Sequence, residues 1–237
     1  MGNVLRIITA TLLTACLMLP GGARAAELGD VVATLEKGYG AMADLQADFS
    51  QRTSIASLQR EERGSGELLL KKGSGGQALF RFDYRKPKQL IVSDGTTVWY
   101  YLPDNRQVLK ADAAKLFAGG NAIALSYLTG LGHLSRDFTI AFAGEGRDKK
   151  GNYLLDLVPK KPSAALKKLQ LTVATVAVER YLASGTAEVA FPIMASTLVD
   201  QLGNRTVIEY SNIKVNRGLG NQRFSFKVPA GVEVIKQ

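Results

Sequence analysis

The segment Leu79–Asp104 reads LFRFDYRKPKQLIVSDGTTVWYYLPD and constrains the fold more than any other part of the chain. Phe80, Phe82 and Tyr84 alternate with polar residues, which predicts a strand. Asp94–Gly95 then predicts a two-residue type I′ turn between two further strands, because both central positions of that turn need φ > 0. The segment is therefore expected to form three consecutive strands.

The hairpin predicted around Asp94–Gly95 has apolar side chains on both faces. A two-residue turn pairs Ser93 with Thr96 and Leu90 with Trp99. One face then carries Leu90, Val92, Trp99 and Tyr101, and the other carries Ile91, Val98 and Tyr100. An exposed antiparallel strand needs only one apolar face, so something else must cover the second one.

The rest of the chain consists mainly of predicted strands. Helices are expected from Asp30 to Met42, over Ala111–Phe117 and over Asn121–Leu131. Strands are expected at Leu45–Ser50, Gly64–Lys72, Gln107–Leu109, Phe138–Phe142, Tyr153–Val158, Leu169–Val178, Glu188–Pro192, Thr197–Gln201, Thr206–Val215 and Phe224–Val228. We expect a mainly β fold of the α+β class, in which a large antiparallel sheet curls because so many strands do not stay flat. The helices would form a lid over an apolar cavity; a fully packed core without a cavity fits the same pattern.

The N-terminus has the features of an export signal. An apolar run, Ile7–Leu19, follows Arg6, and Ala23–Arg24–Ala25 offers small residues for a signal peptidase. We expect a cleaved signal peptide over residues 1–25, a single domain from Ala26 to Gln237 and a periplasmic location. Leu13–Cys16 also resembles a lipobox, which leaves lipidation of Cys16 as the alternative.

Charge and cysteine content narrow the class of protein. The net charge of the chain is +9, and removal of residues 1–25 takes away Arg6 and Arg24, which lowers it to +7. Lysine and arginine are scattered in small groups, as on a solvated surface, and an export signal argues against a nucleic-acid partner. Cys16 is the only cysteine, so the mature chain would have no disulfide and no cysteine-based metal site or nucleophile.

The sequence offers no catalytic constellation. His133 is the only histidine, and no serine lies in a G-x-S-x-G context, so a serine–histidine hydrolase is not expected. No H-x-x-x-H pair or acidic calcium loop suggests a metal site. We therefore expect a binding protein that is not an enzyme and needs no cofactor.

Five segments together resemble the periplasmic outer-membrane lipoprotein carrier protein family, LolA. They are Leu45–Gln51, Gly66–Lys72, Phe80–Tyr84, Ile91–Pro103 and Phe224–Val232. The resemblance implies an incomplete antiparallel β-barrel with a helical lid. It also implies a monomeric carrier that accepts acylated lipoproteins from an inner-membrane ABC transporter, shields their acyl chains and passes them to an outer-membrane receptor.

The resemblance also suggests which residues act. It places Phe80 under the lid, and Phe82, Leu90 and Trp99 lie on apolar strand faces that would bind lipid. In the family an arginine latches the lid through backbone hydrogen bonds. Here that place falls near Lys72, with Arg81 as a second candidate.

Two readings from other classes share the same fold. One is a membrane-tethered lipid- or lipoprotein-binding protein anchored through Cys16. The other is an envelope sensor or structural protein with a filled core. The segment Ala174–Ile193 is longer than the family norm, and its role does not follow from the sequence.

Overall fold

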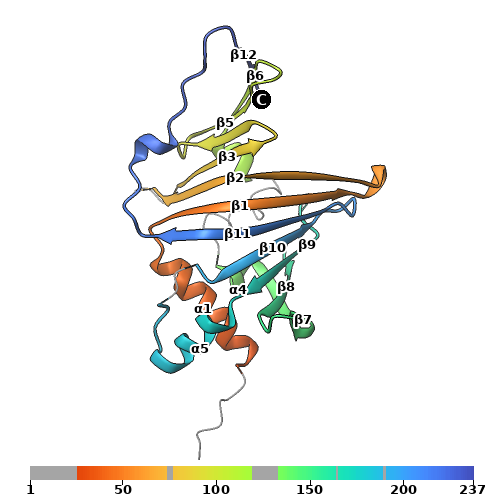
Figure 1. Cartoon of the computed structure of the whole chain (residues 1–237), viewed down its shortest axis with the longest axis vertical. Helices are drawn as coiled ribbons and strands as arrows, with labels where there is room; N and C mark the ends of the chain where they lie inside the picture. Colours follow the sequence, from red (N-terminus) through yellow and green to blue (C-terminus); the bar gives the residue numbers. More distant parts are fainter. Residues whose placement is uncertain (1–25, 74–76, 119–132, 164, 189–190) are drawn as a thin grey trace, which may run out of the picture.

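The computed structural model describes residues 26–73, 77–118, 133–163, 165–188 and 191–237 (Figure 1). Within them, twelve strands form one sheet in the order β12-β6-β5-β4-β3-β2-β1-β11-β10-β9-β8-β7. The strands are β1 Asp44–Ile55, β2 Arg60–Lys72, β3 Ala78–Lys86, β4 Gln89–Ser93, β5 Thr97–Leu102, β6 Gln107–Asp112, β7 Phe138–Arg147, β8 Tyr153–Pro159, β9 Lys168–Val173, β10 Ile193–Val199, β11 Arg205–Val215 and β12 Glu233–Lys236. The helices are α1 Leu28–Ala41, α2 Ala113–Ala118, α4 Leu134–Asp137 and α5 Thr175–Ser184, with 3-10 turns η1 Ala56–Leu58 and η2 Asn221–Phe224.

The sheet consists of two sequential antiparallel meanders, β1–β6 and β7–β11, which join where β1 pairs with β11 (Figure 1). Among the strands of the described residues, only β12 pairs in parallel, along β6. This confirms the predicted fold class, a mainly β protein built on a large, open and curved antiparallel sheet with a few short helices. The expected signal peptide, Cys16 and the expected helix Asn121–Leu131 lie outside the described residues.

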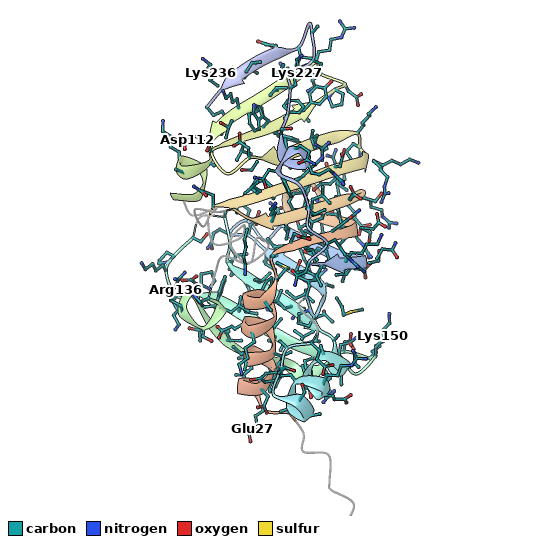
Figure 2. All side chains as sticks on the ribbon, turned by 90° about the vertical axis from the view of Figure 1, so that its left-hand side faces the viewer. Glu27, Asp112, Arg136, Lys150, Lys227 and Lys236 are labelled. Atoms are coloured by element: carbon teal, nitrogen blue, oxygen red, sulfur yellow. The ribbon has the colours of Figure 1, made fainter. Side chains whose placement is uncertain are left out.

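One face of the sheet, here called the α1 face, packs against helix α1. The helix begins at a capping box in which Asp30 accepts a hydrogen bond from the backbone N–H of Glu27 at 2.9 Å. Its buried side chains Val31, Leu35 and Tyr39 recur at helical spacing and join one core cluster with Phe49 and other apolar residues of the sheet. Figure 2 shows Glu27 at one end of the molecule and Lys236, in β12, at the other. No helix in the described part of the chain has both the length and the apolar character needed to cross a membrane.

The opposite face is covered by residues 216–232, here called the C-terminal strap, and is called the strap face. The Asp44 carboxylate holds the start of the strap by accepting backbone hydrogen bonds from Arg217, Gly218 and Leu219 at 2.8, 2.9 and 3.2 Å. Leu219 and Phe224 then pack on side chains of β2 and β3, Leu69 and Leu79. The strap explains why the strands of the Leu79–Asp104 segment are apolar on both faces.

The predicted hairpin register was wrong by two residues. Leu90 pairs with Tyr101 and Val92 with Trp99, so the loop is longer than a two-residue turn. The Asp94 carboxylate accepts hydrogen bonds from the backbone N–H groups of Thr96 and Thr97, both at 2.8 Å, which stabilises the longer loop. Because side chains alternate with a period of two, the shift leaves each residue on its predicted face.

Four predicted strands differ from the structure. In the strand predicted over Glu188–Pro192, the described residues Glu188, Phe191 and Pro192 are not in a strand. The strand predicted over Leu169–Val178 ends at Val173, and α5 follows, because Ala177 and Val178 are buried in the helix. The strand predicted over Thr197–Gln201 is β10, which begins at Ile193. The predicted closing strand Phe224–Val228 is part of the strap, where its aromatic side chains are covered by packing on the sheet instead of by strand pairing.

Candidate functional site

A continuous row of apolar residues crosses the α1 face from β1 to β6. Its members are paired directly in the strand register: Ala47, Leu68, Phe82, Ile91, Tyr100 and Leu109. Burial decreases along the row: the first three residues are buried, and the last three are only half-buried. Five strand spacings give the row a length of about 24 Å. We call it the apolar row.

Aromatic rings thicken the buried half of this row. The centroid of the Phe82 ring lies 5.8 Å from that of Phe49 and 6.2 Å from that of Phe80, and both pairs are arranged edge to face. The ring centroids of Phe49 and Tyr84 lie 4.8 Å apart. The Tyr84 hydroxyl donates a hydrogen bond to the side-chain oxygen of Gln51 at 2.8 Å. Phe80 is 1% exposed and Phe82 is 8% exposed, and both belong to the core cluster that also contains the buried side chains of α1.

The other two predicted lipid-binding residues lie on the strap face. Leu90 pairs opposite Asp83, and Trp99 pairs opposite Val92, all on the face away from α1. The Trp99 ring lies 6.2 Å from Phe226 of the strap. The structure therefore brings Phe80 and Phe82 together but places Leu90 and Trp99 in a different environment.

Lys72 anchors the C-terminal end of α1. Its amine donates hydrogen bonds to the carbonyl oxygens of Tyr39 at 2.6 Å and Gly40 at 3.1 Å. Burial lowers the pKa of Lys72 from its usual value. The next carbonyl, that of Ala41, accepts from the Asn216 side chain at 3.0 Å, and the Asn216 amide oxygen accepts from the backbone N–H of Ala43 at 2.7 Å.

Three consecutive carbonyls at the end of α1 are thus bonded by side chains from two distant segments, β2 and the start of the strap. The predicted latch position Lys72 holds this helix. Arg81 lies on the strap face, where it bonds the Asp83 carboxylate at 2.9 Å and the Arg223 carbonyl at 3.4 Å. Sequence reasoning missed Asn216, which adopts a left-handed backbone conformation (φ 56°) in a turn after β11.

A groove opens between α1 and β7, at the end of the sheet opposite β12. It has a volume of about 480 Å³. Its charged lining residues Glu36 and Lys160 both bond to the backbone of Ser135, each at 2.8 Å. Its apolar lining comes from both elements: Leu28, Val32, Ala33, Phe138 and Ile140.

Tyr39, in the last turn of α1, contributes a polar atom to the core. Its ring lies edge-on to Phe191 at 5.8 Å, and Phe191 lies edge-on to Tyr210 at 5.4 Å. Burial, with a smaller contribution from Tyr210, raises the pKa of Tyr39 well above its ordinary value, so the hydroxyl stays protonated at neutral pH.

The described residues contain no cluster of three or more histidine, cysteine, aspartate or glutamate side chains suited to a metal ion. The arrangement on the α1 face is that of an apolar surface covered by a helix.

Comparison with known proteins gives consistent matches. Residues 41–181 match the family model described as outer membrane lipoprotein carrier protein LolA. A protein named outer-membrane lipoprotein carrier protein from Chromobacterium violaceum is 31% identical over 231 residues, 97% of this chain and 96% of that protein. Another so named, from Albidiferax ferrireducens, is 31% identical over 159 residues, 67% of this chain and 68% of that protein. The crystal structure of an uncharacterized conserved protein from Thermus thermophilus shares the fold, with a TM-score of 0.50 at 13% identity over 88% of this chain and 98% of that one.

Proposed function

Because the chain belongs to the outer membrane lipoprotein carrier protein family, LolA, we propose that it is a periplasmic carrier that binds the acyl chains of lipoproteins on its α1 face. It takes its cargo from an inner-membrane ABC transporter and delivers it to an outer-membrane receptor. It makes and breaks no covalent bond.

The apolar row is the observation that carries this proposal. A closed core needs apolar residues only under α1, yet the row continues through the half-buried Ile91, Tyr100 and Leu109 toward the β6 end of the sheet. Its length of about 24 Å exceeds the roughly 15 Å that an acyl chain spans in one leaflet of a bilayer. An acyl chain lying across the strands would therefore stay on apolar side chains throughout.

A carrier must release its cargo, so part of the free energy gained by burying the acyl chains has to be offset by contacts that the protein loses on binding. Each buried methylene contributes about 0.8 kcal/mol, so two long chains on a freely open surface would hardly dissociate. Here Leu68 and Phe82 of the row belong to the same core cluster as the buried side chains of α1, and Lys72 and Asn216 hold the end of that helix. Displacement of α1 breaks these contacts, and their cost offsets part of the gain from burying the cargo.

Two half-buried residues on neighbouring strands provide a matched test. Ile91 lies on the α1 face, and Tyr101 lies on the strap face with its ring 5.6 Å from Phe226. Affinity for a synthetic diacyl lipopeptide is measured by displacement of an apolar fluorescent dye. Ile91→Ser should weaken binding about fivefold, because it removes roughly half of the contribution of a buried aliphatic side chain. Tyr101→Ser should leave affinity unchanged.

Two results would contradict the proposal. One is a wild-type protein that binds neither the dye nor the lipopeptide. The other is equal weakening by the two substitutions, which would mean that general loss of stability, and not the α1 face, governs binding.

A further inference from the structure

The Tyr39 hydroxyl is buried and has no hydrogen-bond partner in the part of the chain that the structure describes. Tyr39 is 4% exposed, so bulk water does not replace the missing partner. A buried hydroxyl without a partner is destabilising, and such groups are rare enough in folded proteins to require an explanation. Four other tyrosine hydroxyls do have side-chain partners in this protein: Tyr84, Tyr100, Tyr153 and Tyr210.

The position of Tyr39 places this hydroxyl in the core cluster of the α1 face. The residue lies in the last turn of α1 and belongs to the same cluster of buried side chains as Phe80 and Phe82. Its backbone carbonyl is already used, because it accepts the hydrogen bond from Lys72 at 2.6 Å. The side-chain oxygen, in contrast, has no hydrogen-bond partner among the described residues.

The chemistry of the hydroxyl defines what it can bind. It is a neutral O–H donor surrounded by apolar rings, of which Phe191 is one. A charged acceptor would lose its hydration on entering such a place, whereas a neutral carbonyl loses little. An acyl chain has one such carbonyl, at the end where an ester or amide attaches it to its head group, and the rest of the chain has no acceptor.

We propose that the Tyr39 hydroxyl donates a hydrogen bond to the ester or amide carbonyl of a bound acyl chain, and so fixes how far the chain enters beneath α1. This inference rests on the proposed function. Tyr39 on α1 and Phe80 on β3 belong to the same core cluster, so an acyl chain that displaces α1 enters the cluster that contains the hydroxyl. The hydroxyl then gains in the loaded state the partner that it lacks in the empty one, which favours loading.

The test combines one substitution with one change in the ligand. Wild type, Tyr39→Phe and Tyr210→Phe are each titrated with a diacyl lipopeptide and with its dialkyl ether counterpart of equal chain length, which lacks the carbonyls. Wild type should prefer the ester-linked probe roughly fivefold, the value of one neutral hydrogen bond. Tyr39→Phe should lose that preference and bind both probes alike. Tyr210→Phe should keep it, because the Tyr210 hydroxyl already pairs with Ser196 at 2.9 Å.

Thermal unfolding of the ligand-free proteins gives an independent readout. Tyr39→Phe should be as stable as wild type or more stable, because it removes an unsatisfied group. Tyr210→Phe should be less stable, since it leaves the Ser196 hydroxyl without this partner.

Each outcome decides a different point. If wild type binds both probes equally, or if Tyr39→Phe keeps the ester preference, the role of Tyr39 is wrong while acyl binding stands. If Tyr39→Phe unfolds at a clearly lower temperature, its hydroxyl is satisfied within the empty protein and the inference is also wrong. If wild type binds neither probe, the proposed function fails together with the inference.

Discussion

Neighbouring lysines on β2 allow the anchoring of α1 to be tested with an internal control. Lys72 donates to the carbonyls of Tyr39 and Gly40 at the end of α1, at 2.6 and 3.1 Å. Lys71, one residue earlier, points to the other face and donates to the Leu219 carbonyl of the strap at 2.5 Å. Lys72→Met and Lys71→Met each remove a charged donor and keep a side chain of similar length.

The expected cost of Lys72→Met follows from the contacts that are lost. A cation near a helix C-terminus contributes about 0.3–1 kcal/mol, and a hydrogen bond to a charged group about 1.5–3 kcal/mol. Two facts reduce the sum: the lysine is partly buried, which lowers its pKa, and the Tyr39 carbonyl keeps a bond from the Met42 backbone N–H at 3.2 Å. We expect a loss of about 1 kcal/mol in the closed arrangement of α1.

That loss should appear as tighter binding of cargo. If the lipopeptide binds only when α1 is displaced, apparent affinity rises in proportion to the population of the open state. A change of about 1 kcal/mol therefore gives about a fivefold lower Kd for Lys72→Met in the dye-displacement assay. Release to acceptor vesicles should slow correspondingly.

Lys71→Met should lower the unfolding temperature about as much as Lys72→Met does, but it should leave the Kd for the lipopeptide unchanged. An unchanged or higher Kd for Lys72→Met would refute the role of α1 as a cover. An equal fall in Kd for both variants would show that general loosening, and not the end of α1, controls access.

Three further predictions concern stability. Burial raises the pKa of Tyr84 to about 12, so the stability that its protonated form contributes is complete below pH 10 and is lost as pH rises from 10 to 12. Between pH 10 and 12 the free energy of unfolding of wild type should fall by about 2–3 kcal/mol more than that of Tyr84→Phe, as measured by urea unfolding at each pH. The same pH dependence in both proteins would contradict this. Asp44→Ala removes the acceptor of three backbone hydrogen bonds and should cost about 3 kcal/mol, with faster proteolysis within the strap; an unchanged cleavage rate would count against the strap as a held segment. Gly66→Ala would place a Cβ 2.1 Å from the Asp83 carbonyl oxygen and should cost about 3 kcal/mol or more, whereas Gly29→Ala in α1 meets nothing within 4 Å and should be neutral or stabilising in thermal unfolding.

The strand faces could be predicted from the sequence, but not which of them faces α1. The alternation of Phe80 and Phe82 fixed one face of β3, and the period of two kept the hairpin faces correct although its register was wrong. Both faces are apolar because one contributes to the core cluster that includes α1 and the other packs against the strap. Alternation alone does not distinguish two covered faces, so Leu90 and Trp99 were grouped with Phe80 across the sheet.

The remaining differences arise from contacts between distant segments. Phe224 and Phe226 alternate as in a strand, but they pack on the strap face without a strand partner of their own. The β-branched residues that precede and follow Ala177 favour a strand, yet burial against the rest of the core stabilises a helix there. Asn216 and Tyr39 gave no local signal, because the role of each depends on groups far away in the sequence.

The junction between the two meanders means that the fold closes on itself late. Ala43 and Asn216, which share a hydrogen bond at this junction, are 173 residues apart, so the loop-closure entropy is large and the pairing is slow compared with the hairpins on either side. During synthesis, β1–β6 can form from local contacts while β11, the strap and β12 do not yet exist. In that interval the first strand has an unpaired edge, β6 lacks its parallel neighbour and an aromatic surface is bare. Such intermediates are prone to aggregation, so the newly made chain depends most on protection by chaperones until its final twenty or so residues are available.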